Sequence, residues 1–239
     1  MIQPHLLIDS GSISKYCIIV GKPERVLLFK ELLKDFKKVS ENRGFLVYNG
    51  SYKGKNITIC NTGIGGPSAA IAIEELINCG AKVIIRVGSG GVMKKEINTG
   101  DVVISTGVCK EERATTLYAP LEFACVPNYD VLKSLIESAE SLKIKHYYGI
   151  TMCTDSFYAK SHRDKMIEWG NLGVVGSDME SSMLFTISQL RGVKAGFIFY
   201  AGLNIARKEM HKDIINQDKM RKKGELNAIK IALDALLNV

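Results

Sequence analysis

The fold is decided by Asn61-Thr62-Gly63-Ile64-Gly65-Gly66-Pro67-Ser68 and by Val83-Ile84-Ile85-Arg86-Val87-Gly88-Ser89-Gly90-Gly91, which follows closely. Lys55–Cys60, before the first glycines, is rich in β-branched and apolar residues and predicts a strand. Pro67 is tolerated in a first helical turn, so we expect a helix to begin near Ser68. A strand, a glycine turn and a helix in this order direct backbone amides at the turn and favour a bound anion.

Arg86 interrupts the apolar run Val83–Val87, which has the pattern of a central parallel strand covered on both faces. A buried guanidinium costs several kcal/mol unless it is paired. Ser89 and the amides of Gly88–Gly91 can hold the same anion as Arg86. The alternative is that Arg86 pairs with a structural carboxylate and that the glycines only form tight turns.

Composition indicates one α/β domain covering residues 1–239, with a net charge of +7. No apolar run reaches the ~18 residues needed to span a bilayer, so we expect no membrane association. The six cysteines lack metal-ligand spacing and no secretory leader is visible, which predicts reduced thiols, no metal site and a cytoplasmic location. The basic run Lys219–Lys223 is typical of a solvated helix face, so we expect no nucleic-acid partner.

Strand and helix patterns alternate along the chain and predict a three-layer α/β/α sandwich with a central mixed sheet. The predicted strands are Tyr16–Val20, Gly44–Tyr52, Ile57–Cys60, Val83–Val87, Asp101–Ser105, Tyr148–Cys153, Val174–Ser177 and Ala195–Tyr200. The predicted helices are Glu24–Lys34, Ser68–Asn78, Tyr129–Leu142, Ser161–Glu168, Glu180–Leu190 and Gln217–Leu237. Ligands of such sheets bind at the carboxyl ends of strands, and the candidate site residues follow those ends.

Four motifs occur in the order and spacing of the nucleoside phosphorylase family, which includes uridine phosphorylases and hexameric purine nucleoside phosphorylases. They are the glycine-Pro-Ser turn with its helix, Arg86–Gly91, Asp155-Ser156-Phe157-Tyr158 and Asp178-Met179-Glu180-Ser181. The resemblance runs from His5 to about Glu209. It implies a single nucleoside phosphorylase domain and a dimer-based homo-oligomer such as a hexamer.

The resemblance implies a phosphate site. Gly21, Arg25, Arg86 and Ser89 match the family's phosphate-binding positions, and Arg43 matches an arginine contributed by a neighbouring subunit. Phosphate is then a co-substrate and no cofactor is implied.

The resemblance also implies a ribose site. His5 matches a histidine that crosses the subunit interface to the ribose 5'-hydroxyl, and Met179 and Glu180 match the ribose-binding pair. Ser177 and Glu180 have capping-box spacing, which leaves open that Glu180 only closes a helix. Asp178 crowds a second carboxylate at the same strand end and favours the ribose-binding interpretation.

The implied reaction is phosphorolysis, in which a phosphate oxygen attacks C1' of a nucleoside to give ribose 1-phosphate and a free base. The transition state resembles an oxocarbenium ion, so the catalyst positions phosphate and stabilises charge on the sugar and the base. Arg86 and Glu180 match the catalytic positions for the first two tasks.

The base end departs from both branches of the family. Leu203 stands where purine-specific members have a proton-donating aspartate. Asn204 fits the asparagine-arginine pair of uridine phosphorylases but Ile205 does not, and Arg207 is a nearby substitute for the missing arginine. We assign Asn204 and Arg207 to catalysis and Ile205 to base binding.

Phe157 matches a residue that packs on the nucleoside, and Ser161 and Arg163 occupy the positions that read uracil. An aromatic at 157 also suits a core, and Ser161 with Asp164 has capping-box spacing. Uridine is the favoured substrate. The alternatives are a purine nucleoside phosphorylase, a nucleosidase, and a nucleoside-binding protein without catalysis, although the arginine set favours a phosphate-using enzyme over a nucleosidase.

Overall fold

The strands pair into a mixed sheet in a computed structural model that describes residues 1–209 and 216–239. The strands are β1 (Tyr16–Val20), β2 (Lys34–Asn42), β3 (Phe45–Tyr52), β4 (Lys55–Asn61), β5 (Val83–Val92), β6 (Val102–Glu111), β7 (His146–Thr154), β8 (Gly176–Asp178) and β9 (Lys194–Asn204). The α-helices are α1 (Pro23–Leu27), α2 (Gly66–Asn78), α3 (Tyr129–Ser141), α4 (His162–Asn171), α5 (Ser181–Leu190) and α7 (Asp218–Ala235). Short 3₁₀ helices span Leu28–Glu31, Ala114–Leu117 and Leu236–Asn238.

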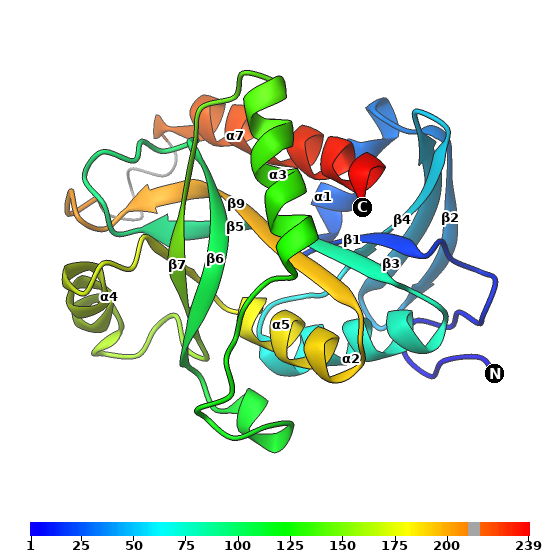
Figure 1. Ribbon diagram of the computed structural model, residues 1–239, viewed down its shortest axis with the longest axis horizontal. Coiled ribbons are helices and arrows are strands. Elements are labelled where there is room, and N and C mark those ends of the chain that lie inside the picture. The colour runs from blue at the N-terminus through cyan, green and yellow to red at the C-terminus, as the bar shows by residue number, and fades with distance from the viewer. Residues whose placement is uncertain (210–215) are drawn as a thin grey trace.

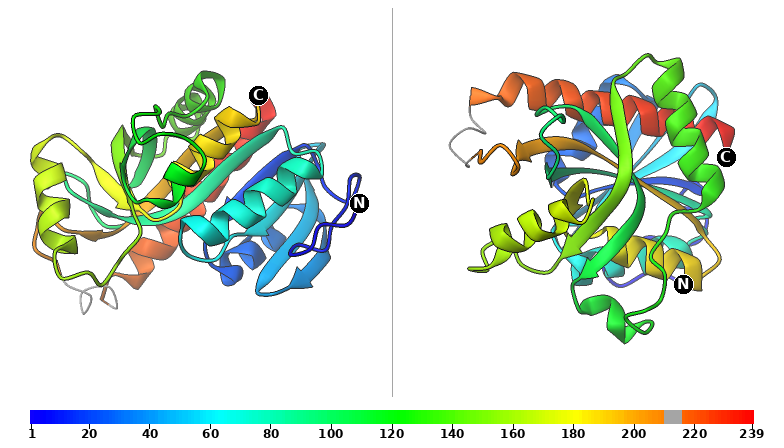
Figure 2. Two further views of the ribbon diagram at one scale, coloured as in Figure 1. Left: turned by 90° about the horizontal axis from the view of Figure 1, so that it is seen from below. Right: turned by 60° about the vertical axis from the view of Figure 1, so that its left-hand side comes forward.

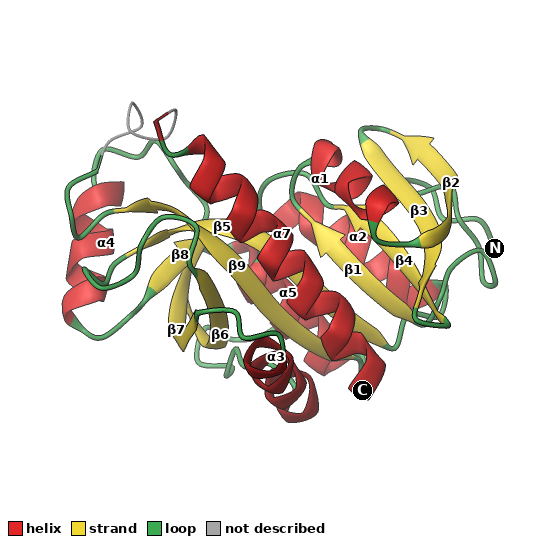
Figure 3. Ribbon diagram, turned by 90° about the horizontal axis from the view of Figure 1, so that it is seen from above, coloured by secondary structure: helices red, strands yellow, loops and turns green. Residues whose placement is uncertain are grey.

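Two apolar cores lie on the two faces of the sheet. The core on one face includes the buried sides of α2 and α5, and the core on the other includes those of α1, α3 and α7. Figures 1 and 3 show α3 and α7 over one face and α2 with α5 on the opposite side. In Figure 2, left, α4 stands at one end of the molecule, far from the N-terminus and the β2–β4 strands. The predicted α/β fold with a central mixed sheet is confirmed.

Part of the sheet closes on itself around β5. This strand pairs with β9 along one edge over its whole length. Along its other edge it pairs first with β1, up to Val87, and then with β8 at Gly91 and Val92. Because β6 also pairs with β9, the strands β5, β8, β7, β6 and β9 form a ring. Gly88–Gly90 therefore lies where β1 has ended and β8 has not begun, and a crevice opens there.

The predicted helix Glu24–Lys34 is wrong. The chain forms one helical turn (α1) and a 3₁₀ turn, and then runs as β2 along the edge of the sheet. Every residue of β2 is at least partly exposed, and Lys34, Lys37 and Lys38 are exposed. Edge strands carry charged residues that block pairing with another chain, so β2 lacks the apolar alternation by which strands are predicted.

All eight predicted strands are present, and β5, β6 and β9 each extend well past the predicted ends because the ring continues their pairing. Within the described residues, no helix combines the length and apolarity that crossing a membrane requires. Burial raises the pKa of the Cys17, Cys60 and Cys153 thiols, which disfavours their reactive thiolate form.

Candidate active site

A cavity of about 570 Å³ opens at the crevice beside β5. Its volume lies within the range of roughly 300–1,000 Å³ that small-molecule sites occupy. The turn between β1 and α1, the glycines at the end of β5 and the start of α5 form one part of its wall. Segment 154–166, the end of β9 and one residue of α7 form the other part. The carboxyl ends of parallel strands thus supply the site, as expected for an α/β sheet.

Arg86 is buried at the centre of the first part of the wall, with its side chain only 4% exposed. Its Nε donates to Asp178 Oδ2 at 3.0 Å, and its Nη2 donates to Glu180 Oε2. Its Nη1 is buried and has no hydrogen-bond partner in the described part of the chain. This nitrogen lies 4.0 Å from the position a Cβ would take on Gly21. A buried donor without a partner is costly, so the free Nη1 indicates an anion beside Gly21.

Arg86 and Glu180 shift each other's pKa. Burial disfavours the charged guanidinium, but Glu180 and Asp178 outweigh that effect and leave the pKa of Arg86 above its usual value. Burial raises the pKa of Glu180, and the nearby Asp178 raises it further, while Arg86 acts in the opposite direction. A carboxylate with a raised pKa in a cleft is typical of a functional site.

The glycine turn holds Glu180. The amide of Gly65, the N-cap of α2 with φ +93°, donates to Glu180 Oε1 at 2.7 Å. The glycine pattern predicts that the amides of this turn face an anion, and in the structure the Gly65 amide faces a carboxylate of the protein itself. Ser68 Oγ donates to Thr62 O at 2.6 Å and fixes the turn from inside.

Asp178 caps the N-terminus of α5. Its Oδ2 accepts from the amides of Glu180 at 3.2 Å and Ser181 at 3.0 Å, and its Oδ1 accepts from Ser181 Oγ at 2.5 Å. The alternative that Ser177 and Glu180 form a capping box is therefore wrong. Asp178 caps α5 instead, and the Glu180 carboxylate faces the cavity. Asp178 also lines the cavity, but its oxygens are taken by these donors and by Arg86.

Arg25 lines the cavity from α1 but is held by α7. Its Nε donates to Glu225 Oε1 at 2.5 Å and its Nη1 to Val87 O at 3.0 Å. Lys22, at the rim, lies 3.3 Å from the same Glu225 oxygen. Sequence reasoning missed Glu225. The available signal was a carboxylate on the apolar face of α7, in line with buried residues three, four and seven positions later.

A model of the phosphorylase superfamily matches residues 15–238. The chain belongs to the phosphorylase superfamily. It is 35% identical to a guanosine phosphorylase of Halorubrum lacusprofundi over 98% of both chains. It is 33% identical to a uridine phosphorylase of Escherichia coli K12 over 91% of this chain and 89% of that one. A crystal structure of uridine phosphorylase from Vibrio fischeri ES114 matches it with a TM-score of 0.92 and 36% identity, over 99% of this chain and 98% of that one.

These findings confirm the predicted family and fold and make the protein a pentosyltransferase of the phosphorylase superfamily. Its cavity brings together most of the residues named from the sequence. They are Gly21, Arg25, Arg86, Ser89, Phe157, Arg163, Asp178, Met179, Glu180 and Ile205.

The far end of the phosphorylase cavity is apolar. Leu203 and Ile205 belong to a small buried cluster with Met166 and all three line the cavity. Phe157 is 45% exposed, and its ring lies 5.1 Å from that of Tyr158. An exposed aromatic ring at a cavity rim suits stacking on a planar ligand better than a place in the core.

Asn204 and Arg207 lie outside the phosphorylase cavity. Asn204 Nδ2 donates to the carbonyls of Lys94 at 2.9 Å and Ile97 at 2.7 Å. Arg207 Nε donates to Lys95 O at 2.8 Å. Both side chains tie the end of β9 to the loop after β5, so the structure gives no support to their predicted catalytic roles.

Ser161 also does not line the cavity, and its side chain makes no capping bond to α4, so neither of its two predicted roles is supported. Arg163 lines the cavity and its Nη1 donates to Glu209 O at 3.2 Å.

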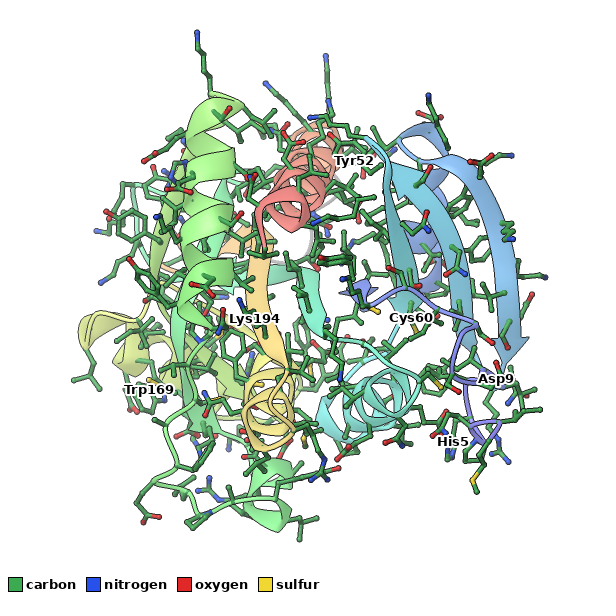
Figure 4. The ribbon with its side chains drawn as sticks, turned by 45° about the vertical axis from the view of Figure 1, so that its right-hand side comes forward. His5, Asp9, Tyr52, Cys60, Trp169 and Lys194 are labelled. Carbon is green, nitrogen blue, oxygen red and sulfur yellow. The ribbon has the colours of Figure 1, made fainter. Side chains whose placement is uncertain are left out.

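His5 and Arg43 do not line the cavity of their own chain. Arg43 is exposed in the turn between β2 and β3, and the neighbouring Asn42 donates through Nδ2 to His5 O at 2.8 Å. His5 Nδ1 lies 2.7 Å from Glu75 Oε1 on α2. Figure 4 places His5 on the opposite side of the molecule from Trp169 of α4. The two predicted interface residues are thus neighbours at one edge of the molecule.

Proposed function

We propose that this protein catalyses the reversible phosphorolysis of a nucleoside, with uridine as the preferred substrate and inorganic phosphate as the co-substrate. The observation that carries the proposal is the buried Nη1 of Arg86, which has no hydrogen-bond partner among the described residues, while the other two guanidinium nitrogens donate to Asp178 and Glu180. A phosphate oxygen beside Gly21 would satisfy that donor.

The proposed reaction needs no covalent intermediate and no cofactor. A phosphate oxygen held by Arg86 and Ser89 attacks C1', and the C1'–N bond breaks as the C1'–O bond forms. The electron pair of the broken bond leaves on the base, the proton that hydrogen phosphate loses on forming the ester goes to the base, and the products are (deoxy)ribose 1-phosphate and free base. Glu180 keeps lone pairs beyond those given to Gly65 and Arg86, and these accept hydrogen bonds from the sugar hydroxyls. Its negative charge stabilises the oxocarbenium-like sugar.

We also propose a homo-oligomer built from dimers, such as a hexamer, in which His5 and Arg43 act in the site of a neighbouring subunit. Support comes from their shared edge, outside their own cavity. Glu75 accepts hydrogen bonds from the His5 amide at 3.1 Å and from His5 Nδ1 at 2.7 Å, and in this tautomer Nε2 can accept a hydrogen bond from a sugar hydroxyl.

Mixed oligomers test this arrangement. If His5 acts in the site of a neighbouring subunit, His5→Ala and Arg86→Ala are each nearly inactive. When equal amounts of the two variants are refolded together, about half of the dimers are mixed and each mixed dimer contains one intact site of two. The mixture should then recover up to about a quarter of the wild-type activity. His5→Ala mixed with Glu180→Gln is expected to give the same rescue. A strictly monomeric active protein in light scattering, or no rescue in mixed dimers of proven composition, would contradict the proposal.

A 6-oxopurine nucleoside is the second candidate, because the guanosine phosphorylase relative matches 98% of both chains. Against it, the position of the purine-protonating aspartate is Leu203, which is 9% exposed in the apolar cluster. We propose a role in nucleoside salvage in the cytoplasm, to which the six free cysteines are suited.

A panel of uridine, thymidine, inosine, guanosine, adenosine and cytidine, assayed with and without phosphate, tests the function. Phosphate-dependent release of uracil supports the proposal, whereas equal release without phosphate identifies a nucleosidase. Binding of a nucleoside with no turnover of any member identifies a binding protein.

A further inference from the structure

Arg221 is an arginine in the cavity that neither the sequence motifs nor the proposed mechanism uses. It reaches the cavity from the first turns of α7. Its Nε is buried and has no hydrogen-bond partner among residues 1–209 and 216–239. Like Arg86 Nη1, this nitrogen is a buried donor that no group in the described part of the chain satisfies, and such a donor is costly unless a ligand satisfies it.

Gly202 provides the space for this guanidinium. A Cβ on Gly202 would lie 4.0 Å from both Nε and Nη2 of Arg221. A β-branched residue at 202 would extend further and displace the guanidinium. Gly202 directly precedes Leu203 on β9, and Leu203 with Ile205 forms the apolar end of the cavity. Arg221 therefore lies beside the segment of β9 that leads into this apolar part of the cavity.

Helix α7 carries Arg221 and also the partner of a residue in the proposed phosphate site. Glu225, four residues after Arg221 and so on the same face of α7, holds Arg25 beside the proposed phosphate. Arg221 lies one turn nearer the start of the helix. Ile205 stands at the motif position of an arginine and Arg207 is bonded to Lys95 O outside the cavity, whereas Arg221 lines the cavity.

We propose that Arg221 is a specificity-determining residue that donates hydrogen bonds to a carbonyl of the nucleoside base and stabilises the negative charge on the departing base. The proposal rests on the proposed function. A guanidinium only donates, so it pairs with O4 of uracil or with O6 of a 6-oxopurine. Cytosine and adenine place an amino group at the corresponding position, and two donors then face each other. The pocket is thus expected to prefer oxo bases to amino bases.

Substitution of Arg221 tests this preference through the ratio of kcat/KM for uridine to that for cytidine, and for inosine to that for adenosine. Arg221→Met keeps the apolar stem and removes the donors. It is expected to lower kcat/KM for the oxo nucleosides about 10- to 100-fold, to leave cytidine and adenosine unchanged, and to leave the KM of phosphate unchanged. Arg221→Lys is expected to recover part of the loss. Lys222→Met, at the adjacent position with a side chain 72% exposed, is the matched control and should behave as wild type.

Gly202 supplies an independent variant. Gly202→Val is expected to reproduce the Arg221→Met ratios by displacing the guanidinium, while Gly202→Ala, with its Cβ at 4.0 Å, should not. Thermal unfolding curves establish that each variant is folded.

Unchanged base ratios in folded Arg221→Met would overturn the proposal, whether activity is retained, is lost equally for all four nucleosides, or falls through a raised phosphate KM. If wild type releases no base in the presence of phosphate, the proposed function fails by itself. Calorimetric titration with uracil and cytosine in phosphate buffer then decides on Arg221, since uracil should bind wild type more tightly than Arg221→Met does, and equal binding would refute its role.

Discussion

Replacing Arg86 with lysine separates its two tasks, which are to neutralise Asp178 and Glu180 and to bind phosphate. Arginine performs both because Nε and Nη2 face the carboxylates and Nη1 faces the side of Gly21. A lysine ammonium is a single point charge on a flexible stem and does not reproduce the fork. It can remain near the carboxylates, but the donor for phosphate is then lost.

The magnitude follows from that one donor. A hydrogen bond to a charged group contributes about 1.5–3 kcal/mol, which corresponds to a phosphate KM raised roughly 10- to 150-fold. Stability should change less, since a positive charge remains beside the two carboxylates. Arg86→Met removes that charge and leaves buried carboxylates uncompensated, which is expected to cost about 3–5 kcal/mol.

The assay is steady-state base release with phosphate varied at saturating nucleoside, together with urea unfolding of both variants. Arg191→Lys is the matched control, because Arg191 pairs with Glu74 at 2.8 Å on the surface with its side chain 47% exposed. It should leave both quantities unchanged. A folded Arg86→Lys enzyme with the wild-type phosphate KM would refute the assignment of Nη1 to phosphate.

The pH profile and the ring closure give two further predictions. Because burial raises the pKa of Glu180, lowering the pH neutralises a carboxylate that the reaction needs, so kcat/KM for the nucleoside should fall on the acid side. Glu180→Gln should give low activity without that acid limb, and an unchanged limb in this variant would mean that another group titrates. Gly90→Ala should lower the free energy of unfolding by about 1–3 kcal/mol or more, because its Cβ would lie 2.2 Å from Ser177 O, where β8 approaches β5. Gly107→Ala, whose nearest neighbour would be at 3.8 Å, is the control in urea unfolding, and equal losses in the two variants would contradict the argument.

The order of strands and helices could be read from the sequence because buried strands and amphipathic helices leave local patterns. The boundaries of β1 agree with the prediction, and α2 begins within two residues of it. The edge strand β2 could not be read, since a strand that is mostly in contact with water needs no apolar alternation. The ring was equally inaccessible, because it depends on β5 sharing one edge between β1 and β8.

The sequence by itself determined the family, the α/β fold and the charged residues of the phosphate and ribose positions, because glycine turns and a buried arginine carry their chemistry in a few adjacent residues. Only the tertiary structure decided which groups those residues meet. The amide of Gly65 binds Glu180, 115 positions away, and Arg25 pairs with Glu225, 200 positions away. The packing of α7 likewise brings Arg221 to Gly202, while Asn204 and Arg207 are drawn to the loop after β5. Contacts between distant segments are set by how the helices pack on the sheet, and no local pattern of residues encodes them.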